Sequence, residues 1–250
     1  MQYDDLNRKY EYYHANKHLL PREVISSYEN AFRVEYTHNS TAIEGNTLSL
    51  IETKLLIEDK ISVGGKDLRE IFEVTNHAKA FDYVRECAEN GKPLDENTVK
   101  DIHQLLMENI FPGGIYRNIN VRISGASFQL PAPNEMYIQI KNFFADLPYK
   151  RNIPPIEYAA WIHAEFIRIH QFTDGNGRTA RMIMNYQLMS DGWLPVSVAK
   201  DDRLDYYKTL EEYAVNDDIN PFTRLILELE TKELDKMIEV IRQIAAQELK

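Results

Sequence analysis

The chain has 250 residues, of which 44% are hydrophobic and 27% charged, a balance typical of a globular protein with one large domain or two small ones. Its formal net charge is -10, and an acidic surface repels a phosphate backbone, so we expect no nucleic-acid partner. The single cysteine, Cys87, excludes an internal disulfide. The first residues lack the apolar core of a signal peptide, and no apolar run approaches the roughly 18 residues of a membrane span. We therefore expect a soluble, cytoplasmic protein that has no membrane partner.

The first 90 residues carry start and stop signals for several helices. Aromatic and apolar residues at four-residue steps from Val24 to Tyr36 predict a helix over about 22–45, with Gly45 as its left-handed stop. Two pairs at the spacing of a capping box predict the starts of the next two helices. These pairs are Ser49 with Glu52 and Asp67 with Glu70.

The interval 114–133 differs from the helical remainder of the chain. It combines short β-like runs with Gly125 between them, and Pro131 and Pro133 follow, which predicts a small hairpin. The fold class is therefore all-α, a helical bundle with a small β-hairpin. The other helices are expected at 94–110, after an N-cap at Asn134, from Pro154 to His170, and after an N-cap at Asn220.

The backbone of the segment HQFTDGNGRTAR, residues 170–181, is suited to an anion. Gly175, Asn176 and Gly177 tolerate positive φ, so this turn can aim successive N–H groups into one concavity. A new helix follows the turn, and its N-terminus adds a positive dipole end and unpaired donors.

The side chains of the same segment supply the remaining parts of a phosphoryl-group site. Arg178 and Arg181 lie three apart, on one side of the new helix, and can clamp phosphate oxygens. Asp174 offers the hard oxygen ligand that Mg²⁺ prefers, and His170 accepts a proton near neutral pH. A structural histidine, a simple turn or a solvated arginine pair would explain each part alone, but their combination within 12 residues favours a site. His163 lacks the HExxH arrangement of a zinc site, so we expect a hydrogen-bonded core histidine there.

The segment resembles the Fic family motif HxFx(D/E)GNGRxxR at every fixed position. The resemblance covers roughly Leu94 to Leu227 and includes a G-x-Y-R stretch from Gly114 to Arg117. Fic proteins of this kind move AMP from ATP to a protein hydroxyl. A phosphate-transferring branch of the superfamily has lysine where this chain has Gly177, so the glycine favours nucleotide transfer.

The resemblance implies a role for each residue of the motif. His170 would be the base that deprotonates a target Ser, Thr or Tyr, and Asp174 would hold Mg²⁺ on the phosphates of ATP. The anion hole and the outer-phosphate contacts would come from Gly175, Asn176, Gly177, Arg178 and Arg181.

The resemblance also implies roles outside the motif. The hairpin would be the family's flap, which positions the target segment, with Ser127 and Phe128 as contacts. Tyr207 and Asn216 resemble the region that surrounds the adenine.

Residues 40–45, STAIEG, match the Fic inhibitory motif (S/T)xxxE(G/N). Alone, they are typical of a helix end with Gly45 as terminator. With the catalytic motif, Ser40 and Glu44 imply that Glu44 forms a bidentate pair with Arg181 and blocks seating of the γ-phosphate.

The sequence thus favours a self-inhibited, Mg²⁺-dependent protein adenylyltransferase that uses ATP and modifies proteins, itself included. Removal of AMP, transfer of another nucleotide, and a non-catalytic nucleotide-binding interaction protein stay open as alternatives. We expect N-terminal helices over 1–60, including the inhibitory helix, to pack with a catalytic helical domain over 61–250 as one compact unit. The resemblance also leaves a homo-oligomer open.

Overall fold

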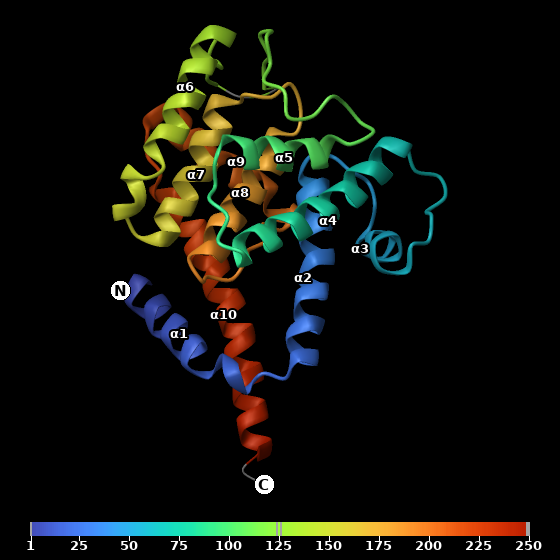
Figure 1. The fold of residues 1–250 in the computed structure, drawn as a ribbon, viewed down its shortest axis with the longest axis vertical. Coiled ribbons are helices and arrows are strands. Elements are labelled where there is room, and N and C mark those ends of the chain that lie inside the picture. The colour runs from blue at the N-terminus through green and yellow to red at the C-terminus, as the bar shows by residue number, and fades with distance from the viewer. Residues whose placement is uncertain (1, 124, 126, 249–250) are drawn as a thin grey trace.

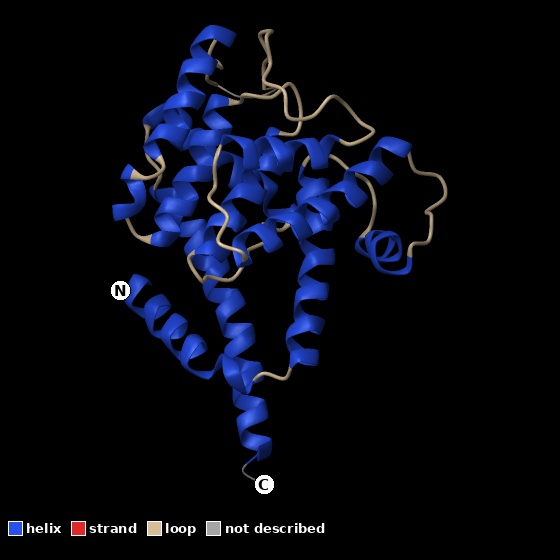
Figure 2. Ribbon diagram, viewed as in Figure 1, coloured by secondary structure: helices blue, strands red, loops and turns tan. Residues whose placement is uncertain are grey.

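The computed structural model describes residues 2–123, 125 and 127–248, and its regular elements there are all helical (Figure 2). The all-α class expected from the sequence is therefore confirmed. Three short 3₁₀ helices lie at Lys17–Leu19, Tyr149–Asn152 and Lys200–Asp202, and a π-helical turn lies at Leu55–Asp59. The α-helices are α1 (Gln2–Asn16), α2 (Arg22–Ile43), α3 (Leu50–Lys54), α4 (Leu68–Glu89), α5 (Glu96–Met107), α6 (Pro133–Asp146), α7 (Pro155–Ile169), α8 (Asn176–Ser190), α9 (Arg203–Asn216) and α10 (Asn220–Glu248).

Local signals set most of the helix ends. The capping box at the start of α3 forms, with Glu52 N donating to Ser49 Oγ at 3.2 Å, and a second box opens α4 at Asp67. Helix α2 ends one residue before Glu44, and Gly45 follows at φ 104°. Two expected starts were wrong, that of α6 by two residues and that of α10 by one. Helix α6 begins at Pro133, which fits a first helical position because its missing N–H would be unpaired there, and α10 begins at Asn220.

Helices α7 and α8 form an antiparallel pair at the centre of the bundle, and other helices cover it (Figure 1). Helix α4 crosses α8, α2 packs against α4, and α9 and α10 pack on α7. Nearly all of α8 from Asn176 to Leu188 is buried, polar residues included. The loop that joins the two central helices, 170–175, is thus held from several sides, and it contains the first half of the motif.

The expected β-hairpin does not form in the described part of 114–133, which is a loop without strand pairing (Figure 2). The physical reason is the buried guanidinium of Arg117, 4% exposed. It donates to Ile119 O at 2.9 Å in one arm and to Pro131 O at 2.6 Å in the other. These carbonyls are paired with a side chain, so the arms are joined without a strand ladder.

None of the helices in the described part of the chain combines the length and the apolar character needed to cross a bilayer.

Candidate active site

The loop between α7 and α8 is shaped by two left-handed residues and one amide. His170 ends α7 at φ 53°, and Gly175 precedes α8 at φ 78°. Between them, the side chain of Asn176 closes the loop: its Oδ1 accepts from Phe172 N at 2.9 Å, and its Nδ2 donates to Phe172 O at 2.8 Å. Phe172 is fully buried. The Asn176 side chain therefore holds the loop, while its backbone lies at the N-terminus of α8.

A cavity of about 300 Å³ opens beside this loop, between α2, the 114–132 loop and α9. It has the size at which small-molecule sites begin. Its walls mix the apolar residues Ile123, Ile167 and Leu210 with a few polar groups. The residues named from the sequence that line it are Glu44, Phe128, His170, Gly177, Arg181 and Tyr207.

His170 is unprotonated at neutral pH. Burial, with a smaller contribution from Arg117, lowers its pKa to about 4, although a backbone contact with Ile167 and the charges of Glu44 and Asp174 oppose the shift. Its Nδ1 is enclosed by protein, so Nε2 is the nitrogen that faces the cavity. A neutral imidazole at the wall of a cavity is placed to accept a proton.

Asp174 lies in the loop just before α8, is not among the residues that line the cavity, and is held by arginines from two helices. Its Oδ1 accepts from Gly175 N at 2.6 Å and from Arg178 Nη2 at 3.1 Å, and its Oδ2 accepts from Arg69 Nη2. Burial alone would raise the pKa of Asp174, but the charges of Arg178 and Arg69 lower it below its usual value. The carboxylate is therefore ionised at neutral pH.

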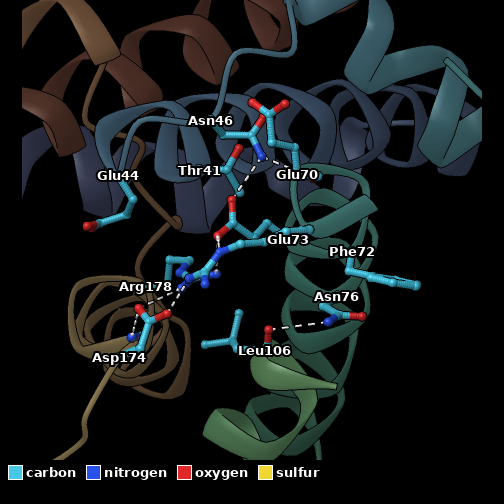
Figure 3. A network of polar contacts seen from close by, with 12 residues as sticks. Thr41, Glu44, Asn46, Glu70, Phe72, Glu73, Asn76, Leu106, Asp174 and Arg178 are labelled. Carbon is cyan, nitrogen blue, oxygen red and sulfur yellow. Dashed lines mark hydrogen bonds and ion pairs between the residues drawn. The ribbon is translucent and has the colours of Figure 1, made fainter. Parts of the chain in front are cut away.

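Arg178 does not line the cavity, in contrast to the expected contact with the outer phosphates. It is 2% exposed and turns toward Asp174 and Glu73, with Nη1 at 3.5 Å from Glu73 Oε1 (Figure 3). In this arrangement it orients Asp174.

Arg181 is held by Ser40 and Glu44 at the end of α2. Its Nη2 donates to Glu44 Oε1 at 2.8 Å and to Ser40 O at 2.7 Å, and its Nε donates to Ser40 Oγ at 2.8 Å. The pair with Glu44 is thus a single bond and not the bidentate contact expected. Its Nη1 reaches Tyr206 Oη at 3.2 Å, so the 1% exposed guanidinium has partners on every nitrogen.

The same glutamate occupies the space above Gly177. A Cβ built at Gly177 would overlap Glu44 Oε1. Gly177 therefore leaves room at the start of α8, and the Glu44 carboxylate fills it. Gly45 lies outside this contact, where its role is to end α2 at positive φ.

The other residues expected outside the motif fall into different places. Ser127 binds the side chain of Glu211, with its N and Oγ donating to Glu211 Oε1 at 3.0 and 2.5 Å. Tyr207 lines the cavity and donates to Ile43 O at 3.2 Å. Asn216 is exposed at the end of α9 and bonds Glu212, so it is not brought to the cavity.

Two buried histidines hold the site from behind. The Nδ1 of His103 accepts from Gly114 N at 2.8 Å, so its Nε2 carries the proton and donates to Asp174 O at 2.9 Å. Its ring stacks on Phe172 at 3.6 Å, and burial lowers its pKa to about 4. His163 is a buried core residue bonded to Tyr206, as expected. Nothing near His103 in the sequence indicated its role, because its partners lie 11 and 71 residues away.

The side chains of the site could hold a metal ion only together with oxygen atoms of a bound ligand. In the described part of the chain, no group of three or more His, Cys, Asp or Glu side chains is arranged to hold a metal ion. The single ionised carboxylate of Asp174, beside the start of α8, fits Mg²⁺, which keeps several waters and takes its other oxygens from substrate phosphates.

The comparisons with known proteins agree with this site. Residues 93–188 match the Fic/DOC family. Over 207 residues, 80% of this chain, the chain is 35% identical to a protein adenylyltransferase Fic of Nematostella vectensis, and it is 34% identical over 88% of its length to one of Culex quinquefasciatus. Residues 93–188 of the chain are therefore a domain of the Fic/DOC family. It spans only about half the length of these curated relatives, 48% and 44%.

Solved structures show the same fold. Fic-1 (residues 134–508) from C. elegans aligns with a TM-score of 0.80 at 28% identity, over 94% of this chain and 70% of that one. A Fic domain containing signaling protein from Bacteroides thetaiotaomicron aligns with a TM-score of 0.86 at 24% identity, over 97% of both chains.

Proposed function

We propose that this protein transfers AMP from ATP to a Ser, Thr or Tyr hydroxyl of a protein, itself included. The hydroxyl oxygen attacks the α-phosphorus, the bond to the bridging oxygen breaks, and pyrophosphate leaves. The hydroxyl proton passes to His170. The observation that carries this proposal is the position of a neutral His170 in one cavity with the N-terminal turn of α8 and with Arg181.

The names of the curated relatives support the same reaction, because they are protein adenylyltransferases. The cavity walls provide an apolar surface between Ile167 and Leu210 for a nucleobase, and Tyr207 offers a ring beside it. Once Glu44 has moved away from Gly177, the start of α8 offers backbone donors to phosphate oxygens.

A divalent cation would be held by Asp174 together with the phosphates. Such an ion neutralises charge that develops on the leaving pyrophosphate. The protein's part is to keep the Asp174 carboxylate ionised and oriented, which Arg178 and Gly175 N do.

Self-inhibition follows from the contact between α2 and α8. Glu44 places a negative charge above Gly177, where a phosphate would lie, and takes a donor of Arg181. A triphosphate that needs the same space and the same donor is therefore repelled until Glu44 moves.

The test is labelling with ATP that carries the label on its α-phosphate. We expect weak self-labelling of the parent, strong labelling of Glu44→Gly, and none of Glu44→Gly/His170→Ala, with mass analysis detecting one adenylyl group. If nucleotide binds to Glu44→Gly but no protein in a cell lysate gains label, the chain is a binding module. Label released from a pre-modified protein would indicate AMP removal instead.

A further inference from the structure

Helix α4 presents an arginine to the carboxylate that the proposed function assigns to the cation. Arg69, in the first turn of α4, donates from Nη2 to Asp174 Oδ2. The other oxygen, Oδ1, is already shared by Gly175 N and Arg178 Nη2. Both oxygens of Asp174 are therefore engaged by protein donors.

Arg69 is held in this position by Glu73, one turn further along the same helix. The Nε of Arg69 donates to Glu73 Oε1 at 3.2 Å. The second oxygen of Glu73 accepts from Asn46 Nδ2 at 3.0 Å, just beyond the inhibitory motif (Figure 3). Glu73 is 8% exposed, so its carboxylate is held in place beside the more exposed Arg69.

The two arginines on Asp174 differ in how easily they can leave. The side chain of Arg178 is 2% exposed and that of Arg69 is 58% exposed. A departing Arg69 is rehydrated with little cost, whereas Arg178 would leave a buried charge without its partner. Arg69 is thus the removable counter-ion of Asp174.

We infer that Arg69 competes with a divalent cation for Oδ2 of Asp174 and so raises the cation concentration at which nucleotide binds. This inference rests on the proposed function, because it takes Asp174 as the cation ligand. Arg69 is a positioning residue. Without the cation it keeps the Asp174 carboxylate in place. With the cation bound, its guanidinium leaves Asp174, keeps its bond to Glu73 and is otherwise hydrated. A guanidinium and a cation cannot share one oxygen without strong repulsion.

Arg69 would restrain a different part of the site from the part that Glu44 covers. Glu44 covers Gly177 and one donor of Arg181, whereas Arg69 covers the metal ligand. The two contacts involve different atoms, so removal of one leaves the other intact.

The experiment measures nucleotide binding by calorimetry, with a non-hydrolysable ATP analogue and graded Mg²⁺, in the Glu44→Gly protein. We expect Arg69→Ala to lower the Mg²⁺ concentration at half-maximal binding by roughly threefold to tenfold, the effect of losing one partly exposed ion pair. Arg69→Gln should act in the same direction. Lys79→Ala is the matched control, because Lys79 is an equally exposed cation of α4 that pairs with Glu108 instead.

Three outcomes overturn the inference. An unchanged Mg²⁺ requirement shows that Arg69 does not compete, while the analogue binding still supports the proposed function. Weaker analogue binding at saturating Mg²⁺ shows that Arg69 contacts the nucleotide itself. Absence of analogue binding in every variant at every Mg²⁺ concentration removes the proposed function, and the inference with it.

Discussion

Two substitutions of Glu44 separate the effects of its charge and its volume. Glu44→Gln removes the charge with little change of size, and Glu44→Gly removes the whole side chain. The pair with Arg181 is partly buried: the Glu44 side chain is 33% exposed and that of Arg181 is 1% exposed. Exposed pairs contribute about 0–1 kcal/mol, and breaking buried ones costs about 3–5 kcal/mol. An intermediate value of about 2 kcal/mol corresponds to roughly 30-fold, and this is the gain in labelling that we expect for Glu44→Gly.

Glu44→Gln separates charge from volume. Its amide oxygen still accepts from Arg181 and still fills the space above Gly177. A neutral hydrogen bond has about half the strength of a charge-assisted one, so we expect about 1 kcal/mol of relief, or roughly fivefold more labelling than the parent.

The assay is the initial rate of self-labelling with α-labelled ATP, at saturating Mg²⁺. The matched control is Glu35→Gln, which removes the same charge from an exposed position of α2. Equal rates for the parent and Glu44→Gly would refute the inhibitory reading of the contact. A rise in Glu35→Gln as large as in Glu44→Gln would show that the net charge of α2 matters, and not the pair.

Three further predictions concern the base, the motif serine and the buried histidines. In the Glu44→Gly background, His170→Ala should abolish labelling yet keep nucleotide affinity within about threefold in calorimetry, since the base is not a phosphate ligand; a large loss of affinity would contradict this assignment. Ser40→Ala leaves Arg181 Nε without an acceptor in a buried site, so urea unfolding should show a loss of about 1–2 kcal/mol, and an unchanged midpoint would argue against the contact. The pKa values of His103 and His170 are about 4 in the folded chain, below the ordinary value near 6.5, so the unfolded chain takes up protons first as pH falls. The stability that the two neutral imidazoles contribute is fully present above about pH 6.5 and is lost as the pH falls toward 4. At pH 5 the loss is about 2 kcal/mol for each histidine. Proton NMR should find both imidazoles neutral at pH 5.5, and titration near 6.5 would exclude the assignment.

The sequence was sufficient wherever structure depends on neighbouring residues. The helix–turn–helix around Gly175 could be predicted because positive φ and the flanking apolar periodicity are local properties. The capping boxes at Ser49 and Asp67 were predictable for the same reason. The contact of Glu44 with Arg181 was implied only by resemblance, since 137 residues separate the two.

The remaining parts of the site depend on packing between distant segments. Arg69 and Glu73 look in the sequence like an ordinary surface pair one helical turn apart. Only the crossing of α4 over α8 brings them to Asp174. The hairpin was wrong because β-propensity of the runs near Gly125 was judged without Arg117, whose guanidinium takes the carbonyls of both arms.

The backbone at His170 has a consequence for how the base is aimed. A non-glycine residue at φ 53° carries a conformational cost of about 1 kcal/mol or more, and the surrounding structure must compensate it. Arg117 does so from the neighbouring loop, with its Nε donating to His170 O at 2.8 Å and its N donating to Gln171 O at 2.9 Å. The 114–132 loop, which is expected to receive a target peptide, therefore also holds the backbone that orients the imidazole of His170. Under the proposed function, a peptide that shifts this loop would also turn His170, so a poorly matched target would misalign the group proposed to accept its proton.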